Sequence, residues 1–467
     1  MKIPKITIIL IAFLAVSSYL PAQTQDKQPL PSSLSLKQAQ EYALKNNTSV
    51  KNAGIDVELA KKKIWETTAI GLPQINATAN YQHLFKVPEM SLGGTTFLDT
   101  KLPAGTMLTA GDILNENVFM GFTPMEPIKL GVKDNTTLDI TVSQLVFSGE
   151  YIVGLQATRV YYQISDRSQK KTEIDLQESV ANTYSLVLVL QQNKKFLSQS
   201  LENMQKTLAE LQAMNKQGFI ENTDVDQIEL TTLNLTNGIK AIDRQIEASN
   251  YLLKFQIGMP LDNQVTLTDN LETIAETNNL ETLSAKKFDV NNNIDYKILS
   301  TQEAFGRLNL KREQSTYLPS LAAVYQHSEK VNKPEFDFAP RDVLALSMSI
   351  PIFSSGQRNS KVQQRKLELQ QITNTKENVG NGLQLEYTNA RNDLSTAYEK
   401  YLNEKKNIEL TERIYQKTLV KLKEGLSSSL DLTNSQNQYI TAQVNYFNAL
   451  YSLITAKNKL SKLTNTL

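Results

Sequence analysis

Two stretches of the sequence end in the same way and decide how the rest is interpreted. Residues 138–149 read LDITVSQLVFSG, and residues 344–356 read LALSMSIPIFSSG. In the second stretch Leu344, Leu346 and Met348 alternate with smaller residues, a period typical of a strand with one apolar face. Each stretch then runs through Phe-Ser and a glycine into a long segment without proline. We therefore expect two strands, each followed by a long helix.

Other blocks of the sequence recur in the same order. Residues 71–83 and residues 317–327 both have Leu-Pro at their second and third positions, and residues 216–225 resemble residues 423–432. Recurrence of strand and turn signals in a fixed order indicates that one unit has been duplicated. Each unit is predicted as helix, strand, loop, strand, very long helix, turn and helix.

The first helix of each unit is predicted over residues 36–65 and 294–315, because the Leu-Pro that follows disfavours further helix. The strand that comes next has apolar residues at alternate positions, as in Ile75, Ala77 and Tyr81. Strands of this kind are about 10–12 residues long, which is enough to cross a bilayer when they are tilted.

The long helices are predicted over residues 148–217 and 356–424. At about 1.5 Å per residue, each would be on the order of 100 Å long and would need support along its side. Apolar residues at heptad spacing predict that support as antiparallel coiled-coil hairpins. The residues in the seams are Leu197, Leu201, Met204, Leu208 and Leu211, then Leu235, Ile239, Ile242, Ile246 and Leu253, and in the second unit Tyr446, Leu450, Leu453 and Leu460.

The chain is expected to divide into four parts. Residues 1–22 have the charged, apolar and small-residue order of a secretory signal. Residues 23–260 form the first repeat, residues 261–287 a linker or equatorial segment, and residues 288–467 the second repeat. The loops over residues 84–136 and 328–341 are expected at the exposed end of a barrel.

Composition argues against several classes of protein. The 49 Lys and Arg balance 48 Asp and Glu, whereas nucleic-acid binders usually carry a basic excess. There is no cysteine, and there are only two histidines, which leaves few groups for metal binding or His-based catalysis. No catalytic triad order or phosphate-binding loop stands out. We expect no enzyme activity and no cofactor.

Four membrane strands are too few for a finished barrel. An open sheet edge in lipid leaves backbone groups without hydrogen bonds, and the smallest closed barrels need about eight strands. Several copies of the chain are therefore expected to share one barrel.

The repeated plan, the Leu-Pro strand starts, the Phe-Ser-Gly strand ends and the Gly-x(5)-Asp turns resemble the outer-membrane efflux, TolC-type, family. The resemblance implies a membrane β-barrel joined to a long α-helical coiled-coil barrel. It implies a homotrimer with four strands per protomer, a 12-stranded barrel in the outer membrane and a helical tunnel in the periplasm. Its implied role is a passive conduit of a tripartite efflux or type I secretion system. The implied partners are outer-membrane lipid, a periplasmic adaptor (membrane fusion protein) and an inner-membrane pump of RND or ABC type.

The resemblance also points to the two turns between the long helices. It implies that Asp224 and Asp431 line the periplasmic entrance, and that Glu221 and Asp226 add negative charge there. A second interpretation is helix capping, since Ser428 and Asp431 have the spacing of a capping box. The adaptor-docking tips are expected at Gly218, Phe219, Gly425 and Leu426.

The second turn departs from the family pattern at three positions. Leu422 stands in place of a tyrosine, Ser427 in place of a basic residue, and Asn434, also expected at the entrance, in place of a second aspartate. The contacts that close the entrance are therefore expected to differ from the usual ones.

Two alternatives remain open. His83 and His327, at matching strand ends, could bind a metal, although a place in an aromatic girdle with Tyr81 and Tyr325 is favoured. The whole chain could also be a periplasmic coiled-coil adaptor or scaffold protein.

Overall fold

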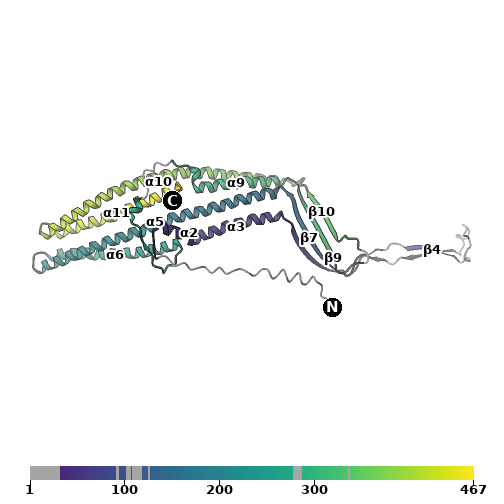
Figure 1. Cartoon of the computed structure of the whole chain (residues 1–467), viewed down its shortest axis with the longest axis horizontal. Helices are drawn as coiled ribbons and strands as arrows, with labels where there is room; N and C mark the ends of the chain where they lie inside the picture. The colour runs from purple at the N-terminus through teal and green to yellow at the C-terminus, as the bar shows by residue number, and fades with distance from the viewer. Residues whose placement is uncertain are drawn as a thin grey trace, which may run out of the picture.

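The computed structural model describes residues 32–90, 94–100, 107, 118–124, 127–276, 287–334 and 337–466. The molecule is elongated, with helices side by side along most of its length and a tilted sheet at one end (Figure 1). The expected secretory signal, residues 1–22, lies outside the described residues.

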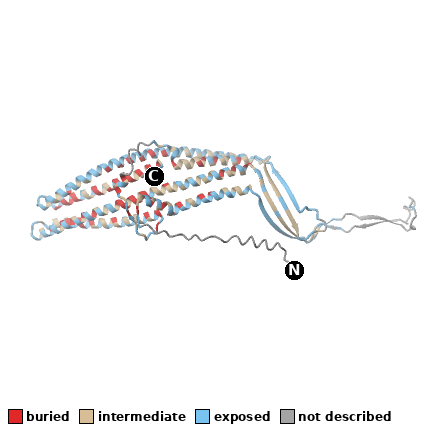
Figure 2. Cartoon of the chain, viewed as in Figure 1, coloured by how far each residue is buried: buried red, intermediate tan, exposed pale blue. Residues whose placement is uncertain are grey.

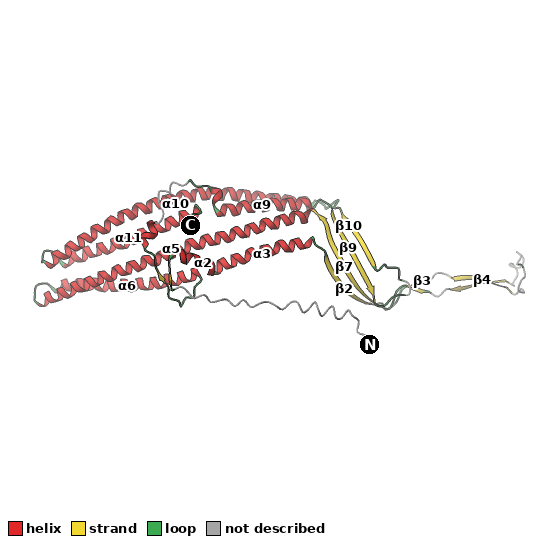
Figure 3. Cartoon of the chain, viewed as in Figure 1, coloured by secondary structure: helices red, strands yellow, loops and turns green. Residues whose placement is uncertain are grey.

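Two groups of elements follow one another along the chain (Figure 3). The first contains β1 (Ser33–Leu34), α2 (Leu36–Asn46), α3 (Thr48–Ile70), β2 (Gln74–His83), β3 (Glu89–Met90), β4 (Gly94–Thr100), β5 (Val118–Pro124), β6 (Ile128–Lys129), β7 (Asp134–Ser148), α5 (Gly149–Lys216) and α6 (Asn222–Ile257). The second contains β8 (Thr266–Leu267), α7 (Leu271–Glu276), η1 (Val290–Asn292), α9 (Ile294–Ser315), β9 (Ser320–Lys330), β10 (Asp342–Ser349), α10 (Gln357–Lys423) and α11 (Ser429–Leu463).

The predicted first helix of unit one is interrupted. Asn47 has an extended backbone (φ −62°, ψ 132°) between α2 and α3. Its side-chain oxygen accepts hydrogen bonds from the backbone N–H of Ser49 and Val50, and its amide donates to the carbonyl oxygen of Gln256 at 2.7 Å. The single helix predicted over residues 36–65 was wrong because Asn47 caps a second helix, which continues to Ile70. In unit two, α9 has the predicted bounds.

The four long strands form one antiparallel sheet in the order β10-β9-β7-β2. Because side chains alternate between faces, residues that pair across strands share a face. The register collects most apolar residues on one face, together with Gln144, His327 and Glu329, and most polar residues on the other, together with Leu145, Val324 and Val343. One face carries Ile75, Ala77, Ala79, Leu138, Ile140, Val142, Leu321, Ala323, Leu344, Leu346 and Met348. The other carries Gln74, Asn76, Thr78, Asn80, Thr137, Asp139, Thr141, Ser143, Gln326, Ser347 and Ser349.

A bulge keeps the apolar face continuous near the helices. The pairing of β7 with β9 shifts between Leu145 and Phe147, so Val146 is the extra residue. The shift brings Phe147 opposite Leu321, on the apolar face. Without the extra residue, Phe147 would project from the polar face.

Neither face of this sheet is covered within the protomer. No residue of β2, β7, β9 or β10 is buried, and Leu344 is 80% exposed (Figure 2). Antiparallel sheets in water normally pack one face against a core. The sheet therefore needs a covering that the protomer does not supply.

The predicted loop over residues 84–136 contains further strands. In its described part β3 pairs with β6, and β4 pairs with β5, all antiparallel. These pairs extend beyond the sheet, away from the helices (Figure 1). Alternating apolar residues are absent from these stretches of the sequence, so no hydrophobic period indicated the strands.

The long helices form two antiparallel hairpins, α5 with α6 and α10 with α11. Helix α5 has 68 residues and α10 has 67, so the predicted lengths are confirmed to within two residues. The predicted seam is also confirmed: Leu197, Met204 and Leu211 are buried at intervals of seven, and Leu201 and Leu208 pack against them. One core cluster near the turns joins the two hairpins, and a larger one lies further along.

The described residues between α6 and α9 lie against the middle of the helical part (Figure 1). Strand β8 of this segment pairs with β1 in parallel. Buried Tyr184 of α5 donates a hydrogen bond to the carbonyl oxygen of Leu34 at 2.9 Å and accepts one from the backbone N–H of Asp269. Burial raises the pKa of Tyr184 to about 12, so it remains a hydrogen-bond donor at any physiological pH. The hydrogen bonds of Tyr184 therefore connect this segment to the larger core.

The described helices were also searched for membrane spans. None of them combines the length and apolarity that a membrane crossing requires.

An ion pair between α9 and α10 gives a test of the helical packing. The carboxylate of buried Glu303 contacts Lys376 at 2.8 Å and also pairs with Arg307, and these partners lower its pKa. We expect Lys376→Met to lower the free energy of unfolding by about 2 kcal/mol at pH 7, typical of a hydrogen bond to a charged group. Because the folded pKa lies below the unfolded value, the contribution is complete above the unfolded pKa and is lost as the pH falls through the folded pKa.

Urea unfolding followed by circular dichroism at pH 7 and at pH 3 measures this effect. The matched control is Lys361→Met, at an exposed position of the same helix. An equal effect of both variants at pH 7 would contradict the role of the ion pair.

Candidate functional site: the turns between the long helices

Each long hairpin closes through a glycine in the left-handed conformation. Gly218 has φ +78° and Gly425 has φ +74°. After each glycine, the next residue donates its backbone N–H to a carbonyl five positions earlier: Phe219 to Met214 at 3.1 Å, and Leu426 to Lys421 at 2.8 Å. These bonds satisfy carbonyls that the ending helix leaves free, and they require a positive φ that glycine adopts without strain.

The residue after each glycine is an exposed apolar side chain. Phe219 is 73% exposed, and Leu426 is 72% exposed. The structure therefore places the four residues predicted as docking tips together at one end of the molecule, at the two turns (Figure 1).

The two aspartates that follow the turns have different surroundings, although each stands six positions after the glycine of its turn. Asp431 is part of the predicted capping box. Its carboxylate accepts hydrogen bonds from the backbone N–H of Ser428 at 3.1 Å, from the hydroxyl of Ser428 at 2.8 Å and from the hydroxyl of Ser427 at 3.1 Å. These bonds, chiefly those from Ser428, lower the pKa of Asp431. The capping interpretation is confirmed for this residue.

Asp224 instead connects the two hairpins. Its carboxylate accepts a hydrogen bond from the hydroxyl of Ser429, which is buried at the start of α11. The cap residue of α6 is Glu221, whose side chain makes no cap hydrogen bond to the helix backbone and accepts one from the hydroxyl of Thr223 at 3.2 Å. Asp224 therefore belongs to a contact between α6 and α11.

A second polar contact joins the hairpins close to the same end. Lys423 of α10 pairs with Glu210 of α5 at 3.0 Å. This ion pair and the hydrogen bond between Asp224 and Ser429 join the two hairpins near their turns, close to the shared apolar cluster. The sequence analysis missed Ser429, Glu210 and Lys423, because no local pattern marks residues that meet from more than 200 positions apart.

The other predicted residues of this end lie as follows. Glu221, Asp226 and Asn434 are exposed. Ser427, at the position of the usual basic residue, supports Asp431, and Leu422 packs against the apolar cluster. Ser427 thus contributes to a helix cap, and Leu422 contributes to an apolar contact.

The two histidines occupy equivalent places at the other end of the protomer. Nδ1 of His83 lies 2.6 Å from a carboxylate oxygen of Asp134, and Nδ1 of His327 lies 2.7 Å from one of Asp342. Tyr81 and Tyr325 donate their hydroxyls to the same two carboxylates. The described residues contain no group of three or more His, Asp or Glu that could hold a metal. These clusters join neighbouring strands at one border of the apolar face.

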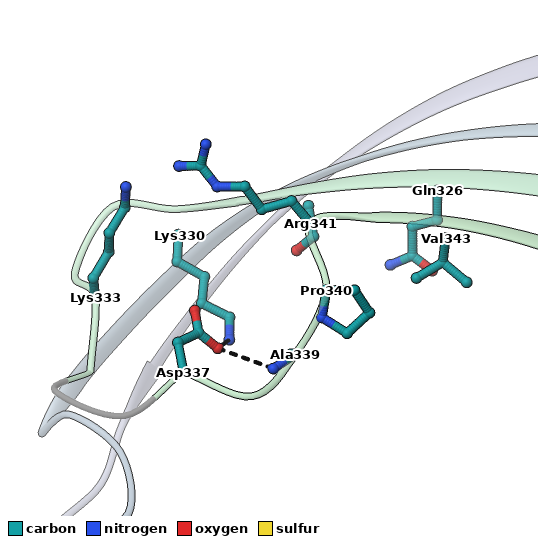
Figure 4. Close-up of a pocket in the computed structure, with 9 residues that line it drawn as sticks. Gln326, Lys330, Lys333, Asp337, Ala339, Pro340, Arg341 and Val343 are labelled. Carbon is teal, nitrogen blue, oxygen red and sulfur yellow. Dashed lines mark hydrogen bonds and ion pairs between the residues drawn. The ribbon is translucent and has the colours of Figure 1, made fainter.

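A small pocket of about 290 Å³ lies at the turn from β9 to β10 (Figure 4). Its cations are already paired: Lys330 contacts Asp337 at 2.6 Å, and Arg341 contacts Glu329 at 2.9 Å. Asp337 also accepts the backbone N–H of Ala339. The pocket is therefore held together by its own ion pairs.

The carboxyl-terminal part of the chain matches a known family in sequence. The matching family model is described as outer membrane efflux protein, and it covers residues 299–466, from α9 past the end of α11. Residues 299–466 are an outer membrane efflux protein domain. The resemblance predicted from the repeated blocks is thereby confirmed. Members of this family are channels and not enzymes, in agreement with the prediction that this chain has no enzyme activity.

Solved structures of efflux channels share the fold. The chain superposes on CusC with a TM-score of 0.71 at 14% identity, covering 95% of this chain and 96% of that one. For the outer membrane protein VceC of Vibrio cholerae the TM-score is 0.68 at 14% identity, with 92% and 95% covered. For the outer membrane channel CmeC of Campylobacter jejuni it is 0.68 at 15% identity, with 100% and 94% covered. No curated protein matches the chain in sequence.

The cap at the second turn gives a direct test of the site geometry. We expect Ser428→Ala to destabilise the start of α11 by about 1 kcal/mol, the usual effect of losing an N-cap side chain. Hydrogen exchange of the first turn of α11, followed by mass spectrometry, should become faster. The matched control is Glu221→Ala at the cap of α6, where no cap hydrogen bond to the helix backbone is lost. Equal changes in exchange at the two helix starts would contradict the assignment.

Proposed function

We propose that this protein is the outer-membrane channel of a tripartite efflux or type I secretion system. It is a passive conduit from a periplasmic adaptor and an inner-membrane pump to the exterior. The observation that carries the proposal is the two-faced sheet joined directly to two long helical hairpins. An exposed apolar face suits lipid, and a polar opposite face suits a water-filled lumen.

Assembly as a homotrimer completes the sheet. Each protomer contributes four strands, so three copies form a 12-stranded barrel, well above the minimum of about eight. The recurrence of α3, β2, β7, α5 and α6 as α9, β9, β10, α10 and α11 supports two structural repeats per protomer. The helices below the sheet form the periplasmic tunnel.

The turns of the hairpins form the periplasmic entrance. In a trimer, Asp224 and Asp431 place six carboxylates around one opening, and Glu221, Asp226 and Asn434 lie nearby. Carboxylates in a ring attract cations and repel anions. The contact between Asp224 and Ser429 and the one between Glu210 and Lys423 hold the two hairpins of each protomer in one arrangement.

The adaptor docks at the turns. Phe219 and Leu426 are large apolar side chains in open solvent at the end of the molecule, where a partner can cover them. The glycines beside them, Gly218 and Gly425, fix the backbone that presents them.

The ring of carboxylates is tested by conductance in planar bilayers. We expect Asp224→Asn with Asp431→Asn to lower the cation-to-anion permeability ratio several-fold, because the charge at the opening is removed. Leak should rise because Asp224 no longer accepts a charge-assisted bond from Ser429. The control is Glu58→Gln with Glu66→Gln, two exposed carboxylates on α3. An unchanged permeability ratio in the first variant would remove the role assigned to the aspartates.

The docking role is tested by export from cells. We expect Phe219→Ser with Leu426→Ser to weaken adaptor binding by about tenfold for each side chain, since burial of one such group contributes about 1.5 kcal/mol. Export should fall while the amount of channel in the outer membrane stays the same. Phe255→Ser, at an equally exposed phenylalanine at the far end of α6, is the control. Normal export by the double variant would exclude docking at these residues.

The alternative is a periplasmic coiled-coil adaptor or scaffold protein, which the two hairpins alone would also fit. Membrane fractionation separates the two functions. A channel is recovered with the outer membrane, whereas an adaptor is recovered with the inner membrane or in solution.

A further inference from the structure

A cavity of about 510 Å³ lies among α3, α5 and α9, close to the end of the helices that meets the sheet. Helix α5 lies between α3 and α9 and packs against both of them (Figure 1). Pockets that bind small organic molecules in proteins have volumes of roughly 300–1,000 Å³. The cavity is therefore large enough to hold such a molecule.

The end of the cavity that lies farther from the sheet is apolar. Phe305 of α9 contacts Tyr161 of α5, with ring centroids 6.2 Å apart, and Leu59 of α3 lines the cavity beside them. Leu59 is 60% exposed and Tyr161 is 45% exposed, so the protomer covers neither side chain. An apolar ligand body placed here would remove this surface from water, which is favourable.

Cations line the cavity towards the sheet. Lys62 and Lys63 of α3 and Arg312 of α9 are accompanied by one carboxylate, that of Glu66, so the lining has a formal charge of +2. Lys63 pairs with Glu66 at 2.8 Å. Arg312 approaches Glu150 only to 3.8 Å, and Lys62 forms no ion pair with any described residue. Two cations are therefore available to an acidic ligand group.

An uncharged polar side chain stands beside these cations. Asn309 of α9 also lines the cavity and lies three positions before Arg312, on the same side of the helix. It is half-buried, and no described residue forms a hydrogen bond with its side chain. Its amide adds a donor and an acceptor for a polar ligand group.

We propose that this cavity binds a small amphipathic organic anion from the aqueous phase. Its aromatic or aliphatic body lies against Leu59, Tyr161 and Phe305. Its carboxylate, sulfonate or phosphate group lies beside Lys62 and Arg312, since a guanidinium group can donate two parallel hydrogen bonds to such an acid. The proposal goes beyond the channel function, because binding at this site does not depend on transport.

The order of the two ends argues against a membrane lipid as the occupant. Arg312 lies three residues before Ser315, the last residue of α9, whereas Phe305 lies ten residues before it. At about 1.5 Å per residue, the acid-binding end is roughly 10 Å closer to the sheet than the apolar end. A lipid whose tails surround an apolar sheet has the reverse order, with its headgroup farther from the sheet. The favoured ligand is therefore dissolved in water.

Binding can be measured through Trp65, which is the only tryptophan of the chain. It lies on α3 between Lys63 and Glu66, within one helical turn of the cavity. The probe is dansylglycine, which combines a naphthalene body with a carboxylate and accepts excitation energy from a nearby tryptophan. With the full chain in detergent, we expect dansyl emission excited through tryptophan to rise with probe concentration and to saturate. Trp65→Phe gives the background.

The cations are tested by a double variant with a matched control. Lys62→Gln with Arg312→Gln should weaken binding of dansylglycine by about tenfold or more, because two charge-assisted hydrogen bonds are lost. The control is Lys61→Gln with Lys311→Gln, which removes the same charge at adjacent positions of the same two helices, outside the lining. It should leave the affinity unchanged. An equal loss in both variants would reduce the effect to general attraction and overturn the site.

A second variant fills the cavity and keeps its charges. A Cβ at Gly154 of α5 would meet only the Cδ of Arg312, at 3.8 Å, so a side chain fits there without strain. We expect Gly154→Leu to abolish binding, whereas Gly382→Leu, at a helical glycine of α10 with open space around it, should leave binding unchanged. Circular dichroism shows whether both variants fold. Saturable binding by folded Gly154→Leu protein would place the probe elsewhere and overturn the proposal.

The chemical class of the ligand is tested with two further additions. Dansylcadaverine, which carries an ammonium group in place of the carboxylate, should bind about tenfold more weakly or less, since the lining repels it. Equal binding of both probes would overturn the preference for anions. Phosphatidylglycerol added in the same detergent should leave dansylglycine bound. Displacement by phosphatidylglycerol, but not by phosphatidylcholine, would assign the cavity to a lipid headgroup and overturn the proposal.

These outcomes are separate from those of the proposed function. Conductance in planar bilayers tests the channel, and energy transfer from Trp65 tests the cavity. Conductance without saturable dansylglycine binding would overturn the site and leave the channel intact. Saturable binding without conductance would do the reverse.

Discussion

The molecule depends on one constraint: its sheet has an apolar face and two backbone edges that the protomer leaves uncovered. In a globular domain, such a face would be buried against helices, and here the helices continue from the ends of the strands instead of lying across them (Figure 2). Backbone groups at a strand edge need partners, and they need them most in lipid, where water cannot supply them. In the proposed trimer, neighbouring copies of the chain would supply these partners.

The helical part obeys a different requirement, which is to keep very long helices straight and paired. Two hairpins share an apolar cluster near the turns, while ion pairs such as Glu303 with Lys376 join neighbouring helices closer to the sheet. The equatorial segment packs against the larger core and holds the amino-terminal strand β1. Polar contacts then adjust the relative position of elements that apolar packing has already brought together.

The two turns share a sequence pattern, but their aspartates have different surroundings. Each has a left-handed glycine, an exposed apolar residue and an aspartate six positions after the glycine. At the second turn Ser427 and Ser428 engage the aspartate in a cap, whereas at the first turn the cap residue Glu221 leaves Asp224 free to meet Ser429. The residues just before each aspartate cause this difference. The carboxylate of Asp431 accepts hydrogen bonds within its own turn, whereas that of Asp224 accepts one from the other hairpin.

The sequence by itself determined the elements and their order, because strand alternation, heptad spacing and Leu-Pro or glycine boundaries are local signals. It also determined the capping box at Ser428 and the family of the carboxyl-terminal part. It did not reveal the break at Asn47, whose partner Gln256 is distant, nor the strands within residues 84–136, which have no apolar period. Only the tertiary structure decided which carboxylate faces which hydroxyl and which strands remain at the edges, because those contacts join residues that are far apart in the chain.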